Sequence, residues 1–269
     1  MGKRASSMRA SVVGGLLVFG AIVAHVSVAS ASVIVDADAS IYDAGNSPLL
    51  YGGDAPVEIL LPAGTTSVSF SSVTGSITCA SAEGCITING GGNYNDPDGV
   101  GAAPSSSSDT GTSTISGITA PNAGYLVGLF VDGTVPTGSA PTSLDFTTGT
   151  SFTSLSPILD QTFFIGDGLT GDGTGSVQTF EVPTGATTLY LGISDACNYN
   201  GPPSCYSDND GYYTASYSLA SNTPISSVPE PASWTILAGA VLGLLGLSLS
   251  ARRASLPDSF AATRDFPAA

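Results

Sequence analysis

The sequence predicts an all-β fold, an antiparallel β-sandwich, for the central part of this 269-residue chain. Short apolar stretches alternate there with turn-forming Gly, Ser, Thr and Pro, and no helical period of useful length occurs. Apolar residues occupy every second position in several stretches, which gives each strand one buried face. Antiparallel strands with one buried face pack as two layers, so we expect a sandwich.

Seven stretches have the composition of strands and end at turn residues. They are 56–62, 66–72, 124–131, 161–166, 177–183, 187–194 and 211–220. The alternation is clearest in three of them, at Val68 and Phe70, at Leu189, Leu191 and Ile193, and at Tyr213, Ala215 and Tyr217. Each of these sets is expected to face the core.

Two polar segments do not fit as strands. Residues 90–117 form a long polar excursion, and long loops in compact domains are usually binding loops or disordered segments. Residues 166–175, GDGLTGDGTG, are a Gly-Asp turn. A single copy without periodicity favours a hairpin connection over an Asp-rich calcium repeat.

The first 31 residues have the order of features of a secretory signal peptide. Basic residues precede an apolar run from Val12 to Val23, and small residues follow as far as Ala31, after which we expect cleavage. The apolar run is too short to cross about 30 Å of hydrocarbon. This boundary leaves 32–221 as the β-domain, followed by a short polar linker at 222–227.

Charge is distributed unevenly along the chain. All six Lys and Arg residues and His25 lie outside 32–227, whereas 18 of the 21 acidic residues lie inside. Nucleic-acid binding is excluded because it needs basic side chains to neutralise phosphates. The excess of carboxylates favours calcium, whose ligands are oxygen atoms, or else forms a soluble acidic surface.

The same composition removes most routes to catalysis. Without His or Lys, the domain has no imidazole acid or base, no lysine nucleophile and no histidine zinc ligand. A carboxylate pair of glycosidase type remains, but the sequence singles out none of Glu58, Glu83 and Glu181. We therefore expect a protein that is not an enzyme.

The four cysteines form two close pairs in an exported chain. Local disulfides Cys79–Cys85 and Cys197–Cys205 are the simplest of three connectivities. A zinc site made of four thiolates is the alternative, and export favours oxidation.

The most informative stretch lies between Leu189 and Ser218. A strand ends at Asp195, and SDNDG leads into the last strand, so an antiparallel hairpin would gather Asp195, Asp208, Asn209 and Asp210 at one rim. Like charges at one rim repel each other unless a cation separates them, and calcium would accept these oxygens. The alternative is that Asp, Asn and Gly only form turns here.

Residues 57–219 resemble the PA-I galactophilic lectin-like domain. The matching pieces are VEILLPAGTTSVSFSSVTGSITC, NDPDG, AGYLVGLFV, TFFIGDG and TTLYLGISD followed by SDNDGYYTASYS. The resemblance implies a β-sandwich of the galactose-binding-like, or jelly-roll, type. It also implies that a bound calcium closes the loops and coordinates sugar hydroxyls. The implied ligands are Asp195, the Cys205 carbonyl, Asp208 and Asn209, with a further carbonyl near Cys79.

The resemblance also assigns sugar contacts to a second loop. DPDG, from Asp96 to Gly99, matches that loop, and we take Asp96, Asp98 and Asp210 as candidate ligand-binding residues. The lectin's sugar-contacting His and Gln are not found there, and NYNGPPSC lengthens the calcium loop. Calcium binding therefore transfers better than galactose specificity.

The C-terminal block resembles the PEP-CTERM sorting signal, which spans 228–253 here. Pro229-Glu230-Pro231 precedes 18 uncharged residues, 234–251, which would rise about 27 Å as a transmembrane helix, and Arg252-Arg253 follow. The resemblance implies processing by an exosortase in a Gram-negative bacterium that makes extracellular polysaccharide. A stiff linker before a permanent anchor is the alternative. The tail, 254–269, is longer than usual for this signal.

Together these features predict a protein exported through the inner membrane, sorted by exosortase and placed at the cell surface or in the extracellular matrix. Its domain is expected to bind glycans, such as extracellular polysaccharide, with the help of calcium. The alternative is a structural matrix or coat protein without a specific ligand.

Overall fold

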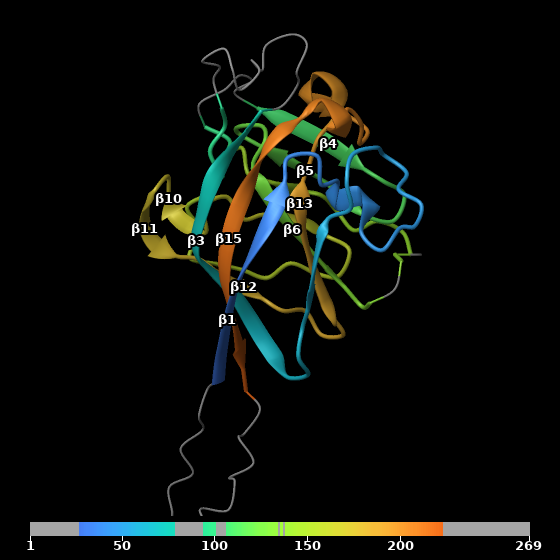
Figure 1. The fold of residues 1–269 in the computed structure, drawn as a ribbon. Coiled ribbons are helices and arrows are strands. Elements are labelled where there is room, and N and C mark those ends of the chain that lie inside the picture. Colours follow the sequence, from blue (N-terminus) through green and yellow to red (C-terminus); the bar gives the residue numbers. More distant parts are fainter. Residues whose placement is uncertain (1–26, 79–93, 101–105, 134, 137, 223–269) are drawn as a thin grey trace, which may run out of the picture. The chain divides into compact units, whose positions relative to one another are not determined.

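The computed structural model describes residues 27–78, 94–100, 106–133, 135–136 and 138–222. In these ranges the chain forms fifteen β-strands and three short 3-10 helices (Figure 1), which confirms the all-β class. The helices are η1 (Ile41–Asp43), η2 (Cys197–Tyr199) and η3 (Tyr206–Asp208). No helix in this described part is long and apolar enough to span a membrane.

Several predictions concern residues outside the described ranges. Backbone contacts divide the chain into Met1–Pro224 and Ile225–Ala269, and the whole second unit lies outside. The predicted features outside are most of the signal peptide, Cys79 and Cys85, the Pro229-Glu230-Pro231 motif, the 234–251 helix, Arg252 and Arg253, and the tail.

The strands form four sheets. The largest has the order β1 (Ser27–Asp36), β15 (Asp210–Ser221), β3 (Thr65–Thr78), β12 (Thr179–Glu181) and β8 (Ser154–Leu155). A second has the order β2 (Val57–Leu60), β13 (Thr188–Ile193), β6 (Leu126–Val131) and β9 (Thr162–Phe164). A third has the order β14 (Asn200–Gly201), β4 (Ser107–Gly111), β5 (Ser116–Ala120) and β7 (Leu144–Asp145). The fourth is the hairpin of β10 (Leu169–Gly171) and β11 (Thr174–Val177).

All seven predicted stretches contain a strand, and 166–175 lies in the β10–β11 hairpin, as predicted. The prediction that residues 90–117 contain no strand is wrong for the last part of this segment, because β4 and the start of β5 lie within 107–117. Their sequences, SSDTG and SGITA, are short and weakly apolar, so the alternation that marks a strand is faint. Pairing with each other stabilises them.

The antiparallel prediction is correct for most strand pairs and wrong for three. The pairs β12–β8, β14–β4 and β5–β7 are parallel. Each contains two residue pairs, and each joins a short strand from a loop to a longer strand, so no extended crossover is needed.

The first strand crosses the predicted signal-peptide cleavage point. β1 pairs with β15 from Ser27↔Ser221 to Asp36↔Tyr212, and Ala31 lies within the ladder. Residues 29–32 are exposed, whereas Val35 is fully buried. Cleavage after Ala31 would therefore shorten the edge strand of the sheet and leave Val35 in place.

Aromatic side chains join the five-stranded sheet and the β2-β13-β6-β9 sheet in one core. Phe180 on β12 lies 5.8 Å, centroid to centroid, from Phe70 on β3 and 5.3 Å from Phe163 on β9. Phe163 stacks at 5.2 Å on Phe130 of β6. All four rings are fully buried. The ring of Phe180 therefore bridges a strand neighbour in its own sheet and a strand of the opposing sheet.

Strands β6 and β13 are buried on both faces, which corrects the expectation of one buried face per strand. Their second face is covered by η1, which contacts both strands. The chain before η1 approaches so closely that a Cβ at Gly192 would lie 2.7 Å from the Ala39 carbonyl oxygen. The sequences of these two strands are therefore nearly continuous apolar stretches, because a further layer covers their second face.

Replacing Phe180 with Ala should lower the free energy of unfolding by about 3–5 kcal/mol, because the cavity would separate the two sheets. Val177→Ala, at a half-exposed position nearby in the chain, should change it by at most about 0.5 kcal/mol. Urea unfolding followed by tyrosine fluorescence measures both. Equal effects of the two substitutions would contradict the bridging role of Phe180.

Candidate functional site

The acidic rim is the edge of the domain formed by Asp195, Asp208 and Asn209. Asp195 follows the last residues of β13, and Asp208 and Asn209 immediately precede β15. The connecting segment, which we call the disulfide loop (196–207), carries η2, β14 and most of η3. It links strands of two different sheets, because β13 lies in the four-stranded sheet and β15 in the five-stranded one.

This connection corrects the predicted hairpin. The sequence prediction brought Asp195 and Asp208 together by pairing β13 with β15, but β13 pairs with β2 and β6, and β15 pairs with β1 and β3. Both strand ends nevertheless reach the same edge, because the sheets pack across the common core. The predicted residues thus meet for a different physical reason.

Tyr206 anchors the disulfide loop from inside. Its ring is fully buried, and its hydroxyl accepts a hydrogen bond from the Asp195 backbone N–H at 3.0 Å. The same hydroxyl donates to the Ile193 carbonyl at 3.2 Å. The two bonds hold the end of β13 where Asp195 leaves the sheet. Sequence reasoning missed this residue, because nothing in CYSDND separates an anchor from a surface tyrosine.

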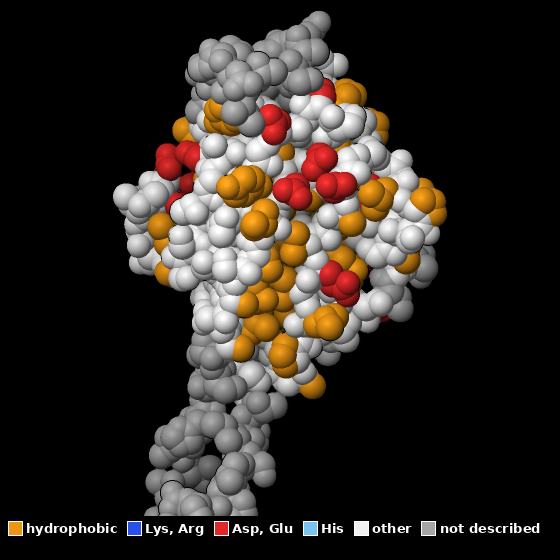
Figure 2. Space-filling model, viewed as in Figure 1, with side chains coloured by type: hydrophobic (Ala, Val, Ile, Leu, Met, Phe, Trp, Pro, Cys, Tyr) orange, Lys and Arg blue, Asp and Glu red, His pale blue; other side chains and the backbone are white. Residues whose placement is uncertain are grey.

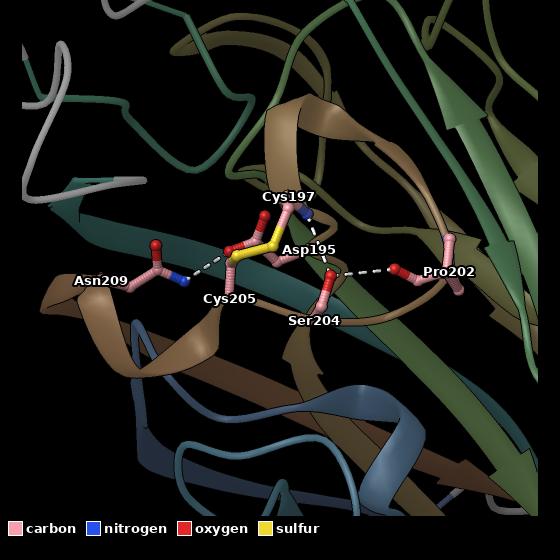
Figure 3. The surroundings of a disulfide bond; sticks show 6 residues. All are labelled: Asp195, Cys197, Pro202, Ser204, Cys205 and Asn209. Carbon is pink, nitrogen blue, oxygen red and sulfur yellow. Dashed lines mark hydrogen bonds between the residues drawn. A yellow bond between two sulfur atoms is a disulfide. The ribbon is translucent and has the colours of Figure 1, made fainter.

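The predicted disulfide Cys197–Cys205 is present, with 5.3 Å between the two Cα atoms. Ser204 closes the loop further, since its hydroxyl accepts from the Cys197 backbone N–H at 3.1 Å and donates to the Pro202 carbonyl at 3.1 Å. Figure 3 shows this arrangement, with Asp195 beside the disulfide. The disulfide and the hydrogen bonds of Ser204 therefore restrict the backbone conformation of the loop near both of its ends.

Asn209 connects the rim to both sheets. Its amide Nδ2 donates to Asp195 Oδ2 at 2.9 Å and to the Ala37 carbonyl at 3.0 Å. Figure 3 shows the amide nitrogen directed at the carboxylate. The bond fixes the orientation of Asn209 and leaves its Oδ1 pointing away from Asp195.

Two oxygens at the rim are buried without a hydrogen-bond partner. They are Asp208 Oδ1 and Asn209 Oδ1. A buried acceptor without a donor costs about 1–3 kcal/mol, so native proteins seldom keep one without water or an ion. The side chains of Asp210 and Asp96 behave differently, since Asp210 accepts from the Gly211 N–H at the start of β15 and Asp96 accepts from the Asp98 N–H in a turn. The turn-forming alternative therefore fits Asp96, and it does not account for the unpaired oxygens of Asp208 and Asn209.

The charge of Asp195 is poorly solvated. Burial raises the pKa of Asp195 to about 7, the hydrogen bond from Asn209 opposes the rise, and the nearby charge of Asp208 adds to it. No described residue is Lys, Arg or His, and Figure 2 shows only acidic charges on one face of the domain. A positive charge at the rim would have to come from a bound cation.

A second buried carboxyl lies behind the rim. Asp109 on β4 accepts from Ser194 Oγ at 3.2 Å and from the Gly111 backbone N–H at 2.9 Å, and Tyr42 OH lies 3.1 Å from Ser194 Oγ. Burial raises the pKa of Asp109 to about 7, and the charge of Asp195 adds to the rise. Sequence reasoning missed this network, because Asp109 lies in the segment taken for a loop.

The other candidate residues lie elsewhere. Asp98 Oδ1 accepts from the Asp167 backbone N–H at 3.0 Å, which joins the DPDG loop to the start of the β10–β11 hairpin. Burial raises the pKa of Asp98 to about 7, with further contributions from the charges of Asp167, Asp96 and Asp172. Asp96 and Asp98 therefore belong to a different acidic group. Asp210 adjoins the rim, but its side chain is exposed.

The rim supplies the donor atoms that a hard cation prefers. In the described part of the chain, no three or more His, Cys, Asp or Glu side chains are grouped to hold a metal ion. The rim offers two carboxylates and one amide oxygen, and Cys205, whose carbonyl is a predicted ligand, lies in the adjoining disulfide loop. Zinc and copper fit poorly, because both thiols of this loop are in a disulfide and no imidazole is present. The oxygen set matches calcium.

Without calcium, the domain should lose stability as the pH rises from about 4 to about 7. The carboxyls of Asp98, Asp109 and Asp195 have folded-state pKa values of about 7, against about 3.9 when unfolded. The folded state thus holds more protons in this interval, and deprotonation favours unfolding. Urea unfolding in chelator across this range measures the trend.

Asp98→Asn should make this decline shallower, since the amide oxygen can still accept from Asp167. Asp145→Asn is the matched control, because hydrogen bonds from Thr147 lower the pKa of this exposed carboxyl. Unfolding free energies that stay constant from pH 4 to 7 in the unaltered protein would contradict the assignment.

Comparison with known proteins finds no matching family model, no similar curated protein and no similar solved structure. A function for this edge of the domain must therefore be argued from the chemistry of its own side chains.

Proposed function

We propose that this chain is an exported, non-enzymatic protein of the cell surface or extracellular matrix whose β-domain binds glycans with the help of calcium. One observation carries the proposal: the buried oxygens Asp208 Oδ1 and Asn209 Oδ1 have no hydrogen-bond partner beside the carboxylate of Asp195. A cation at the rim would satisfy both oxygens and neutralise the carboxylates.

Calcium is the cation that this rim suits best. It takes six to eight oxygen ligands at about 2.3–2.6 Å in flexible geometry and accepts carboxylate, amide and carbonyl oxygens. Asp208 and Asn209 would bind the ion through their unpaired Oδ1 atoms, and Asp195 would join them once its carboxylate turns from Asn209 Nδ2 towards the ion. The Cys205 carbonyl would complete the protein's share. Magnesium demands a stricter octahedron and retains its waters, which fits a rim of mixed oxygens less well. Sugar hydroxyls would occupy the remaining positions.

The glycan part of the proposal is supported by the resemblance of residues 57–219 to the PA-I galactophilic lectin-like domain. This resemblance implies a β-rich domain, and the described part of the chain is all-β. The composition supports an uncharged partner. The domain carries an excess of carboxylates and no Lys or Arg, so it repels nucleic acids and has no basic side chain to pair with an anionic polymer.

The sorting part of the proposal is supported by the order of motifs at the C-terminus. From the sequence, Pro229 and Pro231 would disfavour a helix and favour an extended segment around Glu230 that a protease could read. We propose that the chain resides transiently in the inner membrane of a Gram-negative bacterium, until an exosortase processes it at this motif. The domain would then remain at the cell surface or in the extracellular polysaccharide.

Calcium titration tests the metal site. The unaltered chain should bind one calcium ion calorimetrically, and calcium at 100 times Kd should raise the unfolding free energy by about 2.7 kcal/mol. Asp195→Asn and Asp208→Asn should each weaken binding at least tenfold, because each removes a negative ligand. Asp145→Asn, at an exposed position on β7, should bind calcium as the unaltered chain does.

Glycan binding is then measured on an array, with calcium and with chelator. Signals that require calcium and vanish in Asp208→Asn would support the proposed function. If neither calcium heat nor glycan signal is found, the chain is better described as a structural matrix or coat protein.

Replacing Glu230 with Gln, together with Pro229→Ala and Pro231→Ala, should block sorting. The unprocessed chain should then accumulate in the inner membrane, which fractionation and mass spectrometry of the C-terminus would detect. Ser226→Ala, just before the motif, serves as the control and should be processed normally. Normal release of the triple variant would show that the motif does not direct processing, whereas retention of the unaltered chain in the membrane would show that the helix is a permanent anchor.

A further inference from the structure

A pocket of about 320 Å³ lies between the middle of the disulfide loop and the third sheet. Asn198, Tyr199 and Asn200 line it on the loop side, and Ser108, Thr119 and Thr147 line it on the sheet side. Its volume is at the lower end of the range for small-molecule sites. None of the residues assigned above to calcium lines this pocket.

The lining is rich in hydrogen-bonding groups and carries no charge. Its side chains carry hydroxyls, amides and one phenol ring. Ser106 and Ser107 supply two of the hydroxyls. Such a set can donate to and accept from several hydroxyls at once, while the Tyr199 ring offers an apolar face with a polar tip. This chemistry matches a polyhydroxylated, uncharged ligand.

The loop side of the pocket is held in place before any ligand binds. Asn198 and Tyr199 have positive φ values of 58° and 62°, a conformation that non-glycine residues keep only where the surroundings impose it. β14 pairs with β4 through Asn200↔Ser108, and the disulfide closes the loop at its ends. Little conformational entropy would therefore be lost on binding.

Charge at the border of the pocket selects against acidic ligands. Asp145 is exposed and accepts from the backbone N–H and the hydroxyl of Thr147, a lining residue, at 2.8 Å and 2.7 Å. Hydrogen bonds from Thr147 lower the pKa of Asp145, which keeps this carboxyl ionised. A uronic acid or a sulfated sugar would meet this charge without a basic side chain to balance it.

We propose that this pocket binds one end or one branch of a neutral oligosaccharide, and that it determines which glycan the domain recognises. The inference rests on the proposed function and names its ligand class and contact residues. Calcium would act from the two ends of the loop, where Asp195 precedes Cys197 and Asp208 follows Cys205. Asn198 to Asn200, in the middle of the same loop, would contact the sugar.

The test uses the full-length chain and two sets of probes: oligosaccharides of glucose, galactose and mannose, and oligosaccharides of galacturonic acid. Affinities are measured by calorimetry in calcium. At least one neutral probe should bind, and the acidic probes should bind at least tenfold more weakly. Thr147→Trp should fill the pocket and abolish neutral-probe binding. Asn198→Gly keeps the positive φ but removes an amide, so affinity should fall about fivefold.

Thr148→Trp is the matched control, since Thr148 is exposed beside Thr147 and does not line the pocket. It should retain neutral-probe affinity, and all three variants should retain calcium affinity. Full sugar affinity in Thr147→Trp, or preference for the acidic probes, would overturn the pocket assignment while leaving calcium-assisted glycan binding intact. Absence of glycan binding by the unaltered chain would instead overturn the proposed function, and this inference with it.

Discussion

The hydrogen bonds of the Tyr206 hydroxyl are the interaction on which the rim depends. This buried group receives the Asp195 backbone N–H and donates to the Ile193 carbonyl, so it satisfies the last polar groups of β13 in place of a neighbouring strand. A buried phenol needs such partners, and the end of the strand needs them equally. The chain can therefore leave β13 with the Ile193 carbonyl and the Asp195 N–H both hydrogen-bonded.

The absence of basic side chains shapes the energetics of the domain. Asp98, Asp109 and Asp195 are largely buried, and their neighbours are backbone N–H groups, hydroxyls, amides and other acids. Hydrogen bonds only partly offset the cost of burying a charge, which is why all three pKa values rise. A cation at the rim would relieve this cost for Asp195 directly and for Asp109 through the weaker mutual repulsion. Cation binding and stability would thus be coupled.

Strands with marked alternation could be predicted from the sequence, and strands without it could not. Val68 and Phe70 on β3 and Leu189 and Leu191 on β13 gave the correct buried faces. Asp109 was missed because β4 is polar and gains its stability from pairing with β5. Asp195, Asp208 and Asn209 were predicted as neighbours correctly, but through a hairpin that does not exist. Spacing along the chain indicated their proximity, whereas the path between two sheets is a long-range property that no local pattern encodes.

The position of strand β15 would affect how the domain resists a pulling force, if the chain is held by its C-terminal segment. Its 12 residues span about 36 Å, with Asp210 beside the rim at one end and Ser221 at the other. It is hydrogen-bonded along its length to β1 on one side and β3 on the other. A load applied after Ser221 and resisted at the rim would run along this strand and stress many perpendicular hydrogen bonds together. If the rim binds a polymer and the C-terminal segment attaches the chain, as proposed, this strand would carry the tension between the two.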